Sequence, residues 1–167
     1  ILTLPATGSE SNPGAVITKA STQEKLSFYN PIVRPAFAVL DADVMKTLPE
    51  RQLVNGLLDA WVHVCEQYIT YPVNAMVQDG YSETLLKSLL TLAHNFEQRN
   101  TDNWRENLMW SENQALNGLI GTGVPQAWAT HMLGHELTAL YGVDHALSLI
   151  HIRRRRRIER SEHGVTA

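Results

Sequence analysis

The sequence predicts a mainly α-helical domain preceded by a short β ribbon. From Leu48 to Gly142, apolar side chains recur at the spacing of amphipathic helices. Before Asp41, short β-prone runs alternate with prolines and polar turns instead. The chain has 167 residues, 44% of them hydrophobic, which is enough to build one domain with a buried core.

The ribbon is expected in the segment that ends at Asp41. Its β-prone runs are Ala15–Thr18, Ile32–Val33 and Ala36–Leu40. Prolines at positions 31 and 35 separate the later runs, so the strands must be short. We expect two to four strands, some of them paired as a hairpin.

Four helices are expected after the ribbon. They run from Pro49 to Tyr68, from about Val73 to Phe96, from Trp104 to Ile120 and from Pro125 to Gly142. Proline suits a first helical turn, and glycine suits the position just after a helix. Short loops between such helices indicate a bundle-like domain with its functional site between facing helices.

Composition and charge exclude several classes of protein. The net charge is −3, and the part before Leu147 holds 8 basic against 15 acidic residues, which argues against a nucleic-acid surface. No apolar run is long enough for a membrane span, and no secretory signal is visible. The single cysteine fits a reducing, cytoplasmic compartment. Because the chain begins with Ile, we expect it to be a fragment.

Two pairs of polar residues at helical spacing are candidates for a metal site. His131 and His135 are four residues apart, as are Asp59 and His63, and His145 follows just after the predicted helix end. Residues at this spacing share one helix face, and imidazole is the commonest protein ligand for Zn and Fe. Taken alone, each pair also fits a simpler interpretation, as polar surface neighbours or as a structural Asp–His hydrogen bond.

A short polar loop near the start of the chain is a second candidate site. Thr7 to Asn12 contains small residues with free N–H and hydroxyl groups, which suit close approach to an anion such as a phosphate. An ordinary polar turn has the same composition.

The motifs together resemble the iron-containing (group III) metal-dependent alcohol dehydrogenases. The similarity follows the pattern D-x-x-x-H, then H-x-x-x-H, then a third His, and it includes the TGSE segment. It covers Leu4–Ile17, Phe37–His63 and Gln114–Ala146 most clearly. It is strongest for the NAD(P)H-dependent butanol dehydrogenase and aldehyde reductase branch. The resemblance implies a two-domain dehydroquinate synthase-like fold, in which an α/β nucleotide-binding domain precedes an all-α metal domain.

The resemblance also implies roles for particular residues. It implies that Asp59, His63, His131 and His145 bind a divalent metal, Fe(II) or Zn(II). Thr3, Thr7, Asn12 and Lys25 would lie along the nicotinamide half of NAD(H) or NADP(H). His135 would lie beside the nicotinamide and the substrate, as a proton relay or as a packing residue.

The implied activity is reversible hydride transfer between NAD(P)(H) and a primary alcohol or aldehyde, in an enzyme expected to be a homodimer. Glycerol dehydrogenase and dehydroquinate synthase-like enzymes share the fold, and a non-catalytic helical metal-binding protein is a further alternative. A zinc hydrolase of the HExxH type is disfavoured, because Ala139 stands where its second His would be.

The resemblance divides the chain into three parts. Residues 1–46 would be the end of the nucleotide-binding domain with its ribbon linker, and residues 47–146 an incomplete helical metal domain. We expect such a fragment alone to be inactive and poorly folded, because an incomplete bundle exposes apolar faces. Residues 147–167, with five consecutive arginines, depart from the family pattern and are expected to be a non-native tail. A solvated charge run, or a nucleic-acid or localisation patch, is the alternative.

Overall fold

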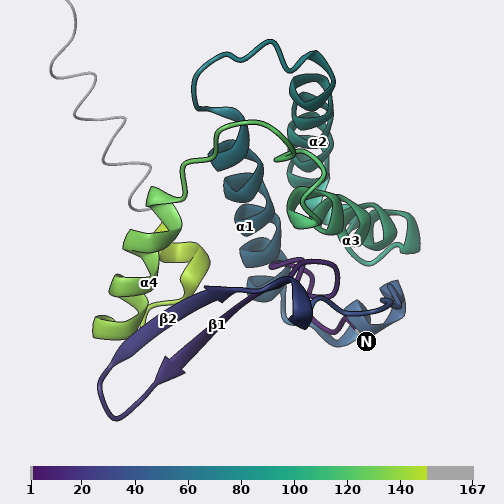
Figure 1. The fold of residues 1–167 in the computed structure, drawn as a ribbon. Helices are drawn as coiled ribbons and strands as arrows, with labels where there is room; N and C mark the ends of the chain where they lie inside the picture. The colour runs from purple at the N-terminus through teal and green to yellow at the C-terminus, as the bar shows by residue number, and fades with distance from the viewer. Residues whose placement is uncertain (1, 150–167) are drawn as a thin grey trace, which may run out of the picture.

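The computed structural model describes residues 2–149 of the chain. The strands are β1 (Gly14–Lys19) and β2 (Glu24–Tyr29), and the α-helices are α1 (Glu50–Tyr68), α2 (Met76–His94), α3 (Asp102–Leu116) and α4 (Ala129–Tyr141). Three short 3-10 helices, Pro31–Val33, Ala42–Thr47 and Phe96–Gln98, lie in the connections. The expected mainly helical fold with a short ribbon is confirmed (Figure 1).

The core lies where α1, α2 and α3 pack against one another. Its fully buried side chains come from all three helices: Ala60 and Val64 of α1, Leu89 of α2, and Leu108 and Ala115 of α3. These positions follow the helical period of the sequence. Trp104 closes one end of this core, where its indole N–H donates to the carbonyl of Leu92 at 3.0 Å.

Helix α4 lies on the other side of α1 from the α2–α3 pair, next to β2 (Figure 1). It therefore faces α1 with one side and the ribbon with another. The segment that precedes α4 is held against α1 by a hydrogen bond, 2.9 Å long, from the backbone N–H of Ala127 to the carbonyl of Glu66. This arrangement puts the polar faces of α1 and α4 opposite each other.

The largest differences from the expected helix ends, four residues each, are at the end of α3 and at the start of α4. Helix α3 ends at Leu116, four residues before Ile120, because Gly118 takes a positive φ of 96° that breaks the helix. Helix α4 begins at Ala129, so Pro125 precedes the helix and does not start it. At its other end Gly142 adopts the left-handed conformation at φ 65°, as expected for a glycine after a helix.

The ribbon is a single antiparallel hairpin. Strand β1 pairs with β2 in a register that puts Gly14 opposite Tyr29 and Lys19 opposite Glu24. The expected strands at Ile32–Val33 and Ala36–Leu40 are wrong. The first is part of a 3-10 turn and the second has no regular structure, since the flanking prolines cannot donate ladder hydrogen bonds.

None of the helices in the described residues is long and apolar enough to cross a membrane. The start of the expected non-native tail, residues 147–149, continues a helical segment from His145. There Ser148 and Leu149 are buried, and both side chains lie close to Gly134 of α4. The rest of that expected tail, including the arginine run, lies outside the described residues.

Candidate metal centre

One face of α1 presents three buried ionisable side chains. Asp59, His63 and Glu66 lie four and then three residues apart, and they are 3%, 4% and 3% exposed. The opposite, apolar face of α1 packs into the core. Burial of so many polar groups is costly unless each finds a partner.

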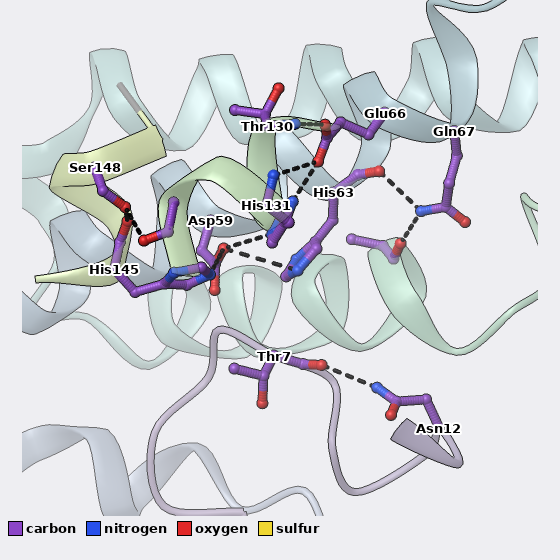
Figure 2. A network of polar contacts seen from close by, with 12 residues as sticks. Thr7, Asn12, Asp59, His63, Glu66, Gln67, Thr130, His131, His145 and Ser148 are labelled. Carbon is purple, nitrogen blue, oxygen red and sulfur yellow. Dashed lines mark hydrogen bonds and ion pairs between the residues drawn. The ribbon is translucent and has the colours of Figure 1, made fainter. Parts of the chain in front are cut away.

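The second element of the site is α4 with the turn that follows it. His131 and His135 project from α4, and the left-handed turn at Gly142 brings the chain back so that His145 reaches the same place. Figure 2 shows the side chains of Asp59, His63, His131 and His145 close to one another. Residues up to 86 positions apart therefore meet in one cluster.

Three imidazoles place their Nε2 atoms around one carboxylate oxygen of Asp59. The Nε2 atoms of His131, His63 and His145 lie 3.3, 3.7 and 3.8 Å from Oδ1 of Asp59. The rings of His63 and His131 are stacked, with centroids 4.4 Å apart. The contact from His131 is at the limit of hydrogen bonding, and the other two are beyond it.

This geometry fits a metal ion. Ligand atoms of a tetrahedral site with bonds near 2.1 Å are about 3.4 Å apart, close to the spacings around Asp59. Ligand atoms of Asp59, His63 and His131 all lie within 4.8 Å of one another. Among the described residues, Nδ1 of His63 and of His145 also has no hydrogen-bond partner. A cation between the Nε2 atoms of His63 and His145 and Oδ1 of Asp59 would replace contacts of 3.7 and 3.8 Å, which are too long for hydrogen bonds.

The electrostatics of the cluster favour neutral imidazoles at His63 and His145, beside a charged carboxylate at Asp59. Burial lowers the pKa of His63 and of His145 to about 4, against the attraction of Asp59. Burial opposes ionisation of Asp59, but the surrounding histidines outweigh it and hold the pKa of that carboxyl below its usual value. Burial also disfavours a charged His131, but its bonds to Asp59 and Glu66 raise its pKa. Neutral imidazole and ionised carboxylate are the forms that bind metals.

Glu66 belongs to this cluster, although the sequence motifs did not point to it. Its carboxylate accepts a hydrogen bond from Nδ1 of His131 and another, 2.6 Å long, from the backbone N–H of Thr130 (Figure 2). Burial opposes its ionisation, but His131 and Thr130 together lower the pKa of Glu66. The signal that could have found it is its position seven residues after Asp59, two turns along the same helix face.

His135 lies beside the cluster and has no direct contact with Asp59 in the described structure. Its ring is 5.0 Å from that of His145, centroid to centroid, and it lines a cavity of about 340 Å³ together with Lys25 and Leu133. Burial and the positive charge of Lys25 lower the pKa of His135 to about 4. Burial also lowers the pKa of Lys25, although Asp59 opposes this.

The structure does not bring the four expected cofactor residues into one cavity. Thr3 and Thr7 line a second cavity, of about 370 Å³, between the N-terminal segment and residues 35–39, whereas Lys25 lines the cavity beside His135. The amide of Asn12 donates to the carbonyls of Thr7 and Gly8 and accepts from the N–H of Gly14. Asn12 therefore shapes the loop (Figure 2).

A buried asparagine on α3, which the sequence motifs also did not indicate, holds this loop against the helices. Asn113 donates to the carboxylate of Glu10 at 2.7 Å and to the hydroxyl of Ser11 at 2.9 Å. Gln114 donates to Asn113 in turn and accepts from Tyr81 of α2. The loop position is thus tied to the packing of α2 and α3.

Glu112 is a buried acid whose carboxyl oxygens have no hydrogen-bond partner in the described part of the chain. Burial raises its pKa well above 4.5, and the negative charges of Asp59 and Glu10 raise it further. An acid with a raised pKa stabilises the fold fully only below its unfolded pKa, and that contribution is lost as the pH rises through the folded pKa.

We therefore expect Glu112→Gln to stabilise the fold at neutral pH. The amide keeps the size of the acid and never has to ionise, so the free energy of unfolding at pH 7.5 should rise by about 1–3 kcal/mol. The gain should shrink toward zero as the pH falls to about 4.5. Urea unfolding at several pH values measures it, with exposed Glu106→Gln on the same helix as the control. A gain that does not depend on pH would contradict this explanation.

Comparison with known proteins places this fold and site in a class. The profile described as "Fe-containing alcohol dehydrogenase family, C-terminal" matches residues 53–152, which is more than half of the chain. The match includes Asp59, His63, His131 and His145. The chain belongs to the iron-containing alcohol dehydrogenase family, as its motifs predicted.

Two curated relatives show which members it is similar to. The chain is 56% identical over 151 residues to the NADPH-dependent aldehyde reductase YqhD of Escherichia coli, covering 89% of this chain and 39% of that protein. It is 38% identical over 151 residues to the NADH-dependent butanol dehydrogenase A of Clostridium acetobutylicum, with the same coverage. The chain thus spans about two fifths of the length of these relatives.

Solved structures agree with this placement. The crystal structure of YqhD from E. coli K-12 superposes with a TM-score of 0.86 at 54% identity, over 89% of this chain and 38% of that one. The NADH-dependent butanol dehydrogenase A of Thermotoga maritima gives 0.84 at 33% identity, over 89% and 37%. The helices and ribbon described above are therefore those of this family.

Proposed function

We propose that the whole protein containing this chain transfers a hydride reversibly between NAD(P)(H) and a primary alcohol or aldehyde, with the help of a divalent metal. The observation that carries this proposal is the convergence of three imidazole Nε2 atoms on Oδ1 of Asp59. The names of the relatives, an aldehyde reductase and a butanol dehydrogenase, support the substrate class.

Asp59, His63, His131 and His145 would hold the metal, and Fe(II) and Zn(II) both suit this donor set. When bound, such an ion acts as a Lewis acid toward a substrate oxygen. One carboxylate against a divalent charge leaves the site positive, which favours the negative charge that develops on that oxygen. The buried position of Asp59 and His63 keeps water away from these donors.

The cavity next to the cluster would receive the reacting groups. Met132 and Leu133 give it an apolar wall, and its polar lining includes His135, Lys25 and Glu136. A neutral His135 can accept a proton there and pass it on, as a relay between the substrate and solvent. Lys25, with Thr3, Thr7 and the loop that Asn12 shapes, would hold the nicotinamide half of the cofactor. The cofactor supplies the hydride, and these residues supply its position.

Three broader features of the whole protein are part of this proposal. The acidic body argues against a nucleic-acid partner, and the single cysteine suits a cytoplasmic location. We expect a homodimer, as the family resemblance implies. The ribbon bears exposed apolar side chains, including Ile17 and Leu26, which a longer polypeptide or a second subunit would cover.

The test is a coupled assay on the longest native polypeptide that contains this chain. Oxidation of NADPH or NADH with butanal should be fast, should stop with a chelator, and should return when Zn(II) or Fe(II) is added. Metal analysis of the purified protein identifies the native ion. Metal binding without any dinucleotide turnover would favour the non-catalytic alternative. Turnover of glycerol but not of butanal would favour a glycerol dehydrogenase.

A further inference from the structure

Glu66 makes two kinds of contact that no metal ligand of the cluster makes. Its Oε2 accepts from Nδ1 of His131, and its Oε1 accepts from the N–H of Thr130 at 2.6 Å (Figure 2). Oε2 also lies 3.3 Å from the backbone nitrogen of His131. One carboxylate on α1 thus binds both a ring nitrogen and the first-turn N–H groups of α4.

The contact with Nδ1 decides which atom of His131 is left for a metal. A neutral imidazole has one N–H and one lone pair, and a carboxylate without a proton can only accept. In the neutral ring that a metal would bind, Glu66 therefore holds the N–H on Nδ1, because this contact is shorter than the 3.3 Å between Nε2 and Asp59. The lone pair is then on Nε2, the atom that faces Asp59. His131 is itself only 5% exposed, so its ring nitrogens have these two carboxylates, and little solvent, as partners.

The contacts of Glu66 with backbone N–H groups of α4 fix the position of the His131 ring. The first N–H groups of a helix have no partner inside the helix, and a negative charge at this end is stabilised by the helix dipole. Thr130 and His131 are in the first turn of α4, so Glu66 caps this helix from a different element. The cap fixes α4 relative to α1, which carries Asp59 and His63.

We propose that Glu66 is a positioning residue of the metal centre, which selects Nε2 of His131 as the ligand atom and holds α4 against α1. This inference rests on the proposed function, since it presumes that the cluster binds a metal. Loss of a carboxylate that orients a metal-binding histidine weakens metal affinity by about 10–100-fold.

The test uses Glu66→Gln, which separates the two roles. The amide oxygen can still accept from Thr130, so the cap survives, but the side chain loses its charge and gains an N–H group that faces Nδ1. The metal-free native polypeptide is titrated with Zn(II) in a competition assay. We expect about 10–100-fold weaker binding for Glu66→Gln and no change for Glu83→Gln, an exposed carboxylate on α2. Binding within about threefold of the unmodified protein would overturn the proposal.

A second measurement needs no variant and remains decisive if Glu66→Gln fails to fold. Nitrogen-15 NMR of the Zn(II)-loaded unmodified protein identifies which ring nitrogen of His131 carries a proton and which binds the metal. A protonated Nδ1 with a metal-bound Nε2 is the expected result, and the reverse would refute the role of Glu66. If the unmodified protein binds no Zn(II) at all, the proposed metal centre itself is wrong, which is a distinguishable result.

Discussion

Replacement of His131 by Ala should weaken Zn(II) binding by more than about 100-fold and abolish turnover of butanal. The change removes one of three imidazoles around Asp59 and leaves the carboxylate of Glu66 without its ring partner. His145→Ala should act in the same direction but less strongly. Its side chain is 23% exposed, so a water molecule can take the place of the lost nitrogen more easily than at His131, where the side chain is 7% exposed.

The measurement is metal content after dialysis together with the coupled assay. His94→Ala is the matched control, because His94 is exposed at the end of α2. It should retain both metal and activity. The ligand assignment fails if His131→Ala and His145→Ala both keep full metal content and activity.

Gly56→Ala should destabilise the fold by about 2 kcal/mol, although Ala normally favours a helix by about 1 kcal/mol over Gly. A Cβ at this position would lie 2.2 Å from the carbonyl oxygen of Pro5 and 2.7 Å from Oε1 of Glu112. The first of these atoms is backbone and cannot move without displacing the N-terminal segment. The overlap therefore outweighs the gain in helix propensity.

Thermal unfolding monitored by circular dichroism checks this expectation. For a chain of this size, the loss corresponds to a fall in Tm of about 4–8 °C. Gly80→Ala on α2 is the control, because a Cβ there meets nothing within 4 Å, and it should stabilise slightly. Effects of equal size and sign at both glycines would show that the close approach of Pro5 does not matter.

The helices could be predicted because their signal is local. Leu53, Leu57 and Val64 follow the helical period, and they are buried in α1 as that period requires. The helix ends were less predictable. The end of α3 depends on the backbone conformation of Gly118, which apolar periodicity alone does not reveal. The start of α4 depends on how the preceding loop packs. The expected strand at Ala36–Leu40 failed because β propensity requires a partner strand to act.

Part of the candidate site could also be predicted from the local spacing of residues. The spacing of Asp59 and His63, and of His131 and His135, places each pair on one helix face through helical periodicity alone. Glu66 has the same helical phase as Asp59, but a carboxylate at such a position is usually solvated, so its role could not be inferred without its partner. Asn113 gives no signal at all, because its partners are about a hundred residues away.

The sequence by itself determined the helical class, the first strand of the ribbon and the family, and it predicted which side chains would bind a metal. These properties follow from local periodicity and from residue types at fixed spacing. Only the tertiary structure decided that the Nε2 atoms of His63, His131 and His145 surround one oxygen of Asp59. It also decided that Glu66 binds the other ring nitrogen of His131, Nδ1. Distances between residues so far apart in the chain depend on how α4 packs against α1, and packing is a property of the whole set of contacts.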